Sequence, residues 1–142
     1  MKVCLIGLEK PLNYLKEVQL VERENIDTWI KGYIKAWNSN DPEDIGRLFS
    51  RDGRYFDGPF REPWRGRDQI ISSWLEQKDE PGDFDVRYEV LGISENKGFV
   101  RGWTNYHNPI HPEWGSYSNL WVIQLNGSGE CEEFIEWWME HK

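Results

Sequence analysis

The amino-acid sequence predicts an α+β domain in which helices pack on one face of a curved antiparallel sheet. Apolar residues recur at helical spacing in the first half of the chain. From Phe84 onward, apolar and polar residues alternate with the period of two that strands require. Helices that precede a run of hairpin-connected strands are typical of this class. The length of 142 residues fits a single domain.

The start of the chain predicts an extension ahead of this domain. Residues 12–22, LNYLKEVQLVE, carry apolar side chains at helical spacing. They indicate an N-terminal extension, residues 1–23, with helical character. The domain itself is expected over residues 24–142.

The next stretch gives the clearest helix signal. Asn25 is a suitable N-cap, and NSND at 38–41 ends the periodic stretch. We expect one helix that lies over the sheet and buries one face. The six apolar residues of that face are Ile26, Trp29, Ile30, Tyr33, Ile34 and Trp37.

Two further helices and a strand complete the first half. Pro42 opens a short helix, PEDIGRLFS, at a first-turn position where its missing N–H costs nothing. The segment GRYFDG predicts a strand, and GPFREPWRG a region of turns. Asp68 is expected to cap a third helix, with apolar residues between Ile70 and Leu75 on one face.

Four long strands are predicted in the second half. The link NGSG between the last two is a strong hairpin signal, because glycine tolerates positive φ. The connections between the earlier strands are ENKG and NPIHPEWG. The strand segments are FDVRYEVLGIS, GFVRGWTNYH, YSNLWVIQL and CEEFIEWWM.

Composition narrows the class of partner. The chain has 25 acidic and 17 basic residues and a net charge of -8. This balance argues against nucleic acid and anionic membranes as partners, since both attract clustered Lys and Arg. Nine Trp, six Tyr and six Phe exceed what a small core needs, so part of this aromatic surface is expected to line a pocket for a small molecule.

Cysteine usage and the N-terminus predict a cytoplasmic location. Cys4 and Cys131 are far apart and do not form a CxxC motif, which favours two reduced thiols. The apolar run in MKVCLIGL stops at Glu9, so it is too short for a signal peptide or a membrane span.

One acidic residue interrupts an otherwise apolar strand. Asp57 lies in RYFDGPF, where a buried side chain would be expected. As a general base it would have to be desolvated enough to take up and return a proton near neutral pH. As a structural residue it would cap the DGPF turn with its own side chain. A guanidinium paired directly with Asp57, such as that of Arg101, would favour a structural role. Sequence pattern alone leaves both roles open.

The element order resembles the nuclear transport factor 2-like superfamily, in particular its SnoaL-like and ketosteroid isomerase-related members. The likeness covers residues 24–142 and is carried by YIKAWNSNDPEDIGRLFSRDG, EPWRGRDQI and NGSGECEEFIEWW. It implies a cone-shaped, cystatin-like fold whose sheet curls around a pocket roofed by the long first helix.

By the same likeness, two residues correspond to catalytic groups of the ketosteroid isomerases. Tyr33 falls on the oxyanion-hole tyrosine and Asp57 on the general base. Trp121 stands where that family has a second, protonated aspartic acid. An indole N–H donates one hydrogen bond but cannot share a proton, so a steroid-type enolate would be less well stabilised here.

Strand alternation predicts which other side chains face the pocket. Side chains point to opposite faces in turn, so if Asp57 points inward, Tyr55 does so as well. A one-residue bulge would reverse such a set. The remaining residues predicted to face a ligand are Arg101, Trp103, Asn105, His107, Asn119, Trp121, Glu136 and Trp138.

Each of these side chains also has a structural interpretation. Tyr33 can pack in the core instead of contacting a ligand. Glu136 can pair with Arg101 instead of acting as a second acid. His107 can act as an acid or base, or be a half-exposed residue at a strand end. Its spacing to His111 does not predict a metal site, because neighbouring prolines exclude a helix there.

Three functions are compatible with these residues. The first is an isomerase, cyclase or dehydratase that acts on a small apolar or aromatic substrate, with Asp57 transferring a proton and Tyr33 stabilising charge. The second is a pocket that binds such a ligand without catalysis. The third is a dimerisation module. No motif requires a cofactor or a metal. A homodimer is expected in each case, because Ile135 and Trp137 lie on the outer face of the last strand.

Overall fold

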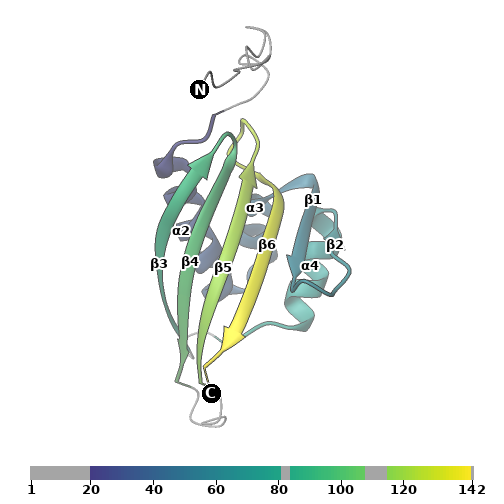
Figure 1. Ribbon diagram of the computed structural model, residues 1–142. Coiled ribbons are helices and arrows are strands. Elements are labelled where there is room, and N and C mark those ends of the chain that lie inside the picture. The colour runs from purple at the N-terminus through teal and green to yellow at the C-terminus, as the bar shows by residue number, and fades with distance from the viewer. Residues whose placement is uncertain (1–19, 81–83, 108–114, 142) are drawn as a thin grey trace, which may run out of the picture.

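The computed structural model describes residues 20–80, 84–107 and 115–141, and these form one layer of helices on one sheet (Figure 1). The helices are α2 (Arg23–Ser39), α3 (Pro42–Leu48) and α4 (Arg67–Glu76). The strands are β1 (Phe49–Asp57), β2 (Trp64–Arg65), β3 (Phe84–Ser94), β4 (Lys97–Tyr106), β5 (Ser116–Leu125) and β6 (Cys131–Glu140). The predicted α+β class is confirmed. The helix expected before residue 20 lies outside the described residues.

The sheet is a curved layer with the strand order β2-β1-β6-β5-β4-β3 (Figure 1). Strands β3 to β6 form the predicted antiparallel meander. Strand β1 pairs in parallel with β6, so the expectation of a fully antiparallel sheet was wrong at this point. Because β1 is followed by the turns and α4 rather than by a hairpin to β6, nothing forces an antiparallel pair. The parallel register places Asp57 beside Glu136.

Helix α2 buries its apolar face against the sheet, as the stripe predicts. Trp29 and Tyr33 are each 4% exposed, and Trp37 is half-buried. The indole N–H of Trp29 donates to the Leu48 carbonyl at 2.8 Å. The helix begins at Arg23, ahead of the predicted Asn25 cap, since the Asn25 side chain instead accepts a hydrogen bond from the Glu22 N–H as part of a capping box.

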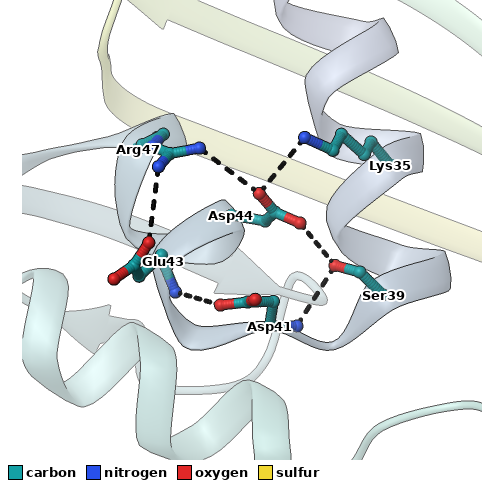
Figure 2. A network of polar contacts seen from close by, with 6 residues as sticks. All are labelled: Lys35, Ser39, Asp41, Glu43, Asp44 and Arg47. Carbon is teal, nitrogen blue, oxygen red and sulfur yellow. Dashed lines mark hydrogen bonds and ion pairs between the residues drawn. The ribbon is translucent and has the colours of Figure 1, made fainter.

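A polar network fixes the corner between α2 and α3 (Figure 2). The Ser39 hydroxyl donates to Asp44 at 2.8 Å, and the Lys35 ammonium lies 3.4 Å from the same carboxylate. The Asp41 side chain caps α3 by accepting from the Glu43 N–H. The Ser39 hydrogen bond lowers the pKa of Asp44, and the nearby cations add to this effect. The network joins the end of α2 to the first turns of α3.

Two glycines of β4 leave room for buried side chains, those of Ile26 from α2 and Trp121 from β5. A Cβ on Gly98 would lie 2.5 Å from Cδ1 of Ile26, and one on Gly102 would lie 2.6 Å from Cη2 of Trp121. Any larger residue would displace these buried side chains. The inner face of β4 therefore has small residues where α2 and Trp121 fill the core.

Candidate functional site

A cavity of about 270 Å³ lies between the helices and the inner face of the sheet. Eight of its fifteen lining residues are aromatic. Three carboxylates share this wall: Asp57 at the end of β1, Glu136 on β6, and Asp79 after α4. Acidic groups among aromatic rings are the main chemical feature of the site.

Glu136 is hydrogen-bonded to a buried pair of tyrosines. The Tyr55 hydroxyl donates to its Oε2 at 2.6 Å, and the Tyr33 hydroxyl lies 3.3 Å from that of Tyr55. Burial raises the pKa of Glu136 from 4.5 to about 7; the Tyr55 hydrogen bond opposes this shift, and the charge of Asp57 adds to it. Glu136 therefore exchanges its proton near neutral pH.

Tyr55 and Tyr33 remain hydrogen-bond donors at physiological pH. Burial is the main cause that raises the pKa of both phenols well above the ordinary value, and the charge of Glu136 raises both further. A protonated phenol beside a carboxyl group can donate to it or to a bound oxygen atom. The chain Tyr33–Tyr55–Glu136 thus connects the core of the domain to the cavity.

Trp121 lies beside the hydrogen-bonded residues Tyr55 and Glu136 but does not line the cavity. It is Glu136's partner in the β5–β6 register and is fully buried. Its indole N–H has no hydrogen-bond partner among the described residues. It lies near enough to Glu136 to lower the pKa of that carboxyl, although it does not meet hydrogen-bond geometry. Trp121 therefore favours the charged form of Glu136.

Asp57 faces the cavity, but its carboxylate is already held on both sides. The Arg61 guanidinium lies 3.0 Å from Oδ2, and the Trp138 indole N–H donates to Oδ1 at 3.3 Å. Within the described chain, no backbone N–H donates to this carboxylate, so it does not cap the following turn. The guanidinium that pairs with it is Arg61, where the sequence suggested Arg101. Asp57 is anchored in the wall of the cavity.

Asp79 was missed by sequence reasoning. Its Oδ2 accepts from the Trp37 indole at 2.7 Å and from the Tyr106 hydroxyl at 2.9 Å. The Asn40 side chain donates to its backbone carbonyl at 2.8 Å. No periodicity marks a residue in the segment after a helix, so only the tertiary fold reveals it. Tyr117, which also lines the cavity, could have been found, because it shares the strand parity of Asn119.

The parity prediction is correct for β1 and β6, and for β5 apart from Trp121, which is buried without lining the cavity. Tyr55 and Asp57 on β1, and Glu136 and Trp138 on β6, line the cavity. So does Asn119 on β5, where its amide donates to the Thr104 hydroxyl at 2.9 Å. These side chains come from adjacent strands of the sheet, which is why alternation places them together.

The parity prediction is wrong for β4. The buried positions are Val100, Gly102 and Thr104, so Arg101, Trp103 and Asn105 lie on the outer face. The inner positions are small where Ile26 of α2 and Trp121 fill the space, and the alternation was assigned to the opposite face of this strand. The predicted ion pair between Glu136 and Arg101 is therefore also wrong.

The outer β4 residues have partners of their own. The Trp103 ring contacts the guanidinium groups of Arg87 and Arg101, at 4.4 and 4.6 Å from the ring centroid. Asn105 accepts from the Ser116 hydroxyl at 2.6 Å. His107 is exposed, with its Nε2 2.6 Å from Asp85, and does not line the cavity.

Among the described residues, no group of three or more His, Cys, Asp or Glu side chains is arranged to hold a metal ion. His111 lies outside them. Within residues 20–80, 84–107 and 115–141, no helix is long and apolar enough to cross a membrane.

The model of the SnoaL-like domain family matches residues 30–130. The chain belongs to this family. No match was found among curated proteins.

Solved structures share the fold of this SnoaL-like domain. An NTF-2 like protein of unknown function from Burkholderia xenovorans is similar with a TM-score of 0.64 and 14% identity, over 84% of this chain and 86% of that one. A putative ketosteroid isomerase from Kribbella flavida gives a TM-score of 0.61 and 18% identity, over 84% and 81%. A ketosteroid isomerase-like protein from Erwinia carotovora gives 0.59 and 19%, over 83% and 96%.

Proposed function

We propose that this SnoaL-like domain binds a small apolar or aromatic molecule in its cavity and transfers a proton to or from it. Isomerases, cyclases and dehydratases all require such a step. The observation that carries the proposal is Glu136, a carboxyl group in an aromatic cavity whose pKa is about 7. The sequence suggested Asp57 as the base, and we assign that role to Glu136 instead.

The three groups of the hydrogen-bond chain have separate roles in this proposal. Both forms of Glu136 are populated near neutral pH, so the carboxylate can take a proton and the acid can return it. The Tyr55 hydroxyl orients the carboxyl group through its 2.6 Å hydrogen bond. The Tyr33 hydroxyl, 3.3 Å from that of Tyr55, can stabilise negative charge that develops on a bound oxygen.

Asp57 serves as a positioning group. Its ion pair with Arg61 and its hydrogen bond from Trp138 hold the end of β1 and the rim of the cavity. The charge of Asp57 also raises the pKa of Glu136. The variant Asp57→Asn is therefore a matched comparison for Glu136→Gln, since both replace a carboxylate of the same cavity by an amide.

Base-catalysed ring opening of 5-nitrobenzisoxazole tests the proposal without knowledge of the substrate. A base removes the C–H proton of this flat aromatic probe, the N–O bond breaks, and a coloured cyanophenolate forms. We expect the rate to rise with pH through about 7, and Glu136→Gln to lose about 100-fold or more of it. Asp57→Asn should lose less than about tenfold. Equal rates for wild type and Glu136→Gln would reject acid–base catalysis and leave a binding module.

A second proposal concerns assembly. No helix of the described chain covers the outer face of the sheet (Figure 1). Strand alternation places four exposed apolar side chains on this face, those of Leu91, Leu120, Trp137 and Met139. We propose that two copies pair through this face as a homodimer, which buries these side chains. The predicted cytoplasmic location also stays a proposal.

Sedimentation of the purified protein tests the dimer. We expect twice the mass of one chain at micromolar concentration and a shift toward monomer for Trp137→Glu, because a buried unpaired carboxylate is costly. Phe60→Glu, at a position 99% exposed in the turn after β1, is the control and should stay dimeric. A wild-type monomer would contradict the proposal.

A further inference from the structure

We infer that the cavity selects ligands that carry a positive charge, namely a protonated amine on a small apolar or aromatic body. The inference rests on the proposed function, because it names the class of molecule that the same cavity takes. It starts from an imbalance of charge in the cavity wall, where carboxylates from β1, β6 and the segment after α4 lie among aromatic rings.

Two of the three carboxylates have no cationic partner among the described residues. Asp79 accepts hydrogen bonds from an indole and a phenol, and Glu136 accepts one from a phenol. Only Asp57 has a guanidinium partner, Arg61. The cationic residue that lines the cavity is Lys78, which is exposed at its edge. A desolvated carboxylate is costly without an opposite charge, and a bound ammonium would supply that charge.

The aromatic walls add a second source of attraction for a cation. The Tyr106 and Tyr117 rings lie 5.6 Å apart between centroids, and the Tyr117 and Trp138 rings 6.0 Å apart. All three line the cavity, as does Trp37. The face of an aromatic ring attracts an ammonium group, and desolvation strengthens this attraction. The same rings pack well against the apolar body of the ligand.

Other charge types fit the cavity less well. An anionic ligand would meet the charges of Asp57, Asp79 and Glu136 in a partly desolvated space. A metal ion needs ligands that converge on one point, and no such group exists among the described residues. A neutral ligand leaves the charges of Asp79 and Glu136 without a partner. An organic ammonium with an apolar body matches both the spread of the carboxylates and the aromatic surface.

The preference for a cation should depend on pH through Glu136. Its carboxyl group has a pKa of about 7, so the cavity gains a negative charge as the pH rises through that value. An alkylammonium stays protonated over the same range. Affinity for a cation should therefore increase from acidic to neutral pH. The titratable and charged groups around Glu136 are Tyr33 from α2, Tyr55 and Asp57 from β1, Lys78 and Asp79 after α4, Tyr106 from β4 and Tyr117 from β5.

Three probes of the same shape isolate the effect of charge. Phenethylamine carries an ammonium, 2-phenylethanol is neutral, and phenylacetate is an anion. Binding of each to the full chain is followed by calorimetry and by the fluorescence of the tryptophans that line the cavity. Near pH 8 we expect the ammonium to bind about tenfold or more tightly than the alcohol, and the anion to bind most weakly. The difference between ammonium and alcohol should shrink below about pH 6.

Amide variants test whether the carboxylates cause this preference. Glu136→Gln should abolish the pH dependence, and Asp79→Asn should weaken phenethylamine binding about tenfold while leaving 2-phenylethanol within about twofold. Glu133→Gln is the control, because Glu133 lies on the same strand but pairs with Arg54 and does not line the cavity. If Asp79→Asn fails to fold, phenethylamine binding by Glu136→Gln and the pH profile of the wild type still test whether the carboxylates cause the preference for a cation.

The outcomes separate this inference from the proposed function. Equal binding of the ammonium and the alcohol would overturn the preference for a cation and leave a pocket for neutral molecules intact. Tightest binding of the anion would overturn it as well. Binding of none of the three probes would reject both the inference and the cavity as a site for small apolar or aromatic ligands.

Discussion

Glu136→Gln is expected to stabilise the folded protein by about 3 kcal/mol near pH 8, although it removes the proposed base. The folded state holds the Glu136 proton up to about pH 7, whereas the ordinary pKa is 4.5. Between these values the folded state binds more protons than the unfolded chain, so stability falls as pH rises. This contribution to stability is fully present below about 4.5 and is lost as pH rises through about 7. The amide of Gln does not ionise, so the variant does not lose stability as the pH rises through about 7.

Urea unfolding at several pH values measures this effect. The free energy of unfolding of Glu136→Gln should match that of wild type near pH 4.5 and exceed it near pH 8. Glu133→Gln is the comparison on the same strand, with a partner at the surface, and should change stability by less than about 1 kcal/mol at each pH. A Glu136→Gln protein that is less stable than wild type near pH 8 would contradict the raised pKa.

Trp29→Ala is expected to destabilise the fold by about 3–5 kcal/mol, the largest loss among the substitutions discussed. The Trp29 ring packs against Tyr33, Phe49 and Phe134, with centroid distances of 5.4, 5.9 and 5.2 Å. Its removal leaves a cavity at the centre of the helix–sheet interface. It also leaves the Leu48 carbonyl without the 2.8 Å hydrogen bond from the indole.

Thermal and urea unfolding of the variant test this expectation. Phe60→Ala is the matched control, because it also removes an aromatic ring but at a position 99% exposed to solvent. It should change stability by less than about 0.5 kcal/mol. A loss below about 1 kcal/mol for Trp29→Ala would mean that α2 does not depend on this contact.

The sequence predicted the fold well because its strongest patterns reflect burial. The stripe of α2 is visible since one face must be apolar over four turns, and NGSG fixes the hairpin before β6. The parallel pairing of β1 with β6 was missed. Strand order between distant segments depends on tertiary packing, which local periodicity does not encode.

The candidate site was predicted only in part, and β4 explains why. The inner residues from Gly98 to Thr104 are small, because α2 and Trp121 occupy the core there, while Arg101 and Trp103 lie outside. Strand alternation groups the residues that share a face, but it does not say which of the two groups is the inner one, and the wrong group was chosen for β4. Glu136 was correctly placed inward, but its expected partner Arg101 lies on the opposite face. Burial raises the pKa of Glu136, and no cation among the described residues pairs with its carboxylate to oppose that shift.

The pKa of Glu136 is the quantity on which the proposed chemistry depends, and NMR titration of the side-chain carboxyl carbons measures it directly. Glu136→Gln assigns the resonance, and Tyr55→Phe checks its environment. We expect a midpoint of about 7 in wild type, and a higher one in Tyr55→Phe because the phenol favours the charged carboxylate. A midpoint near 4.5, unchanged by Tyr55→Phe, would contradict the assignment of Glu136 as the proton-transfer group.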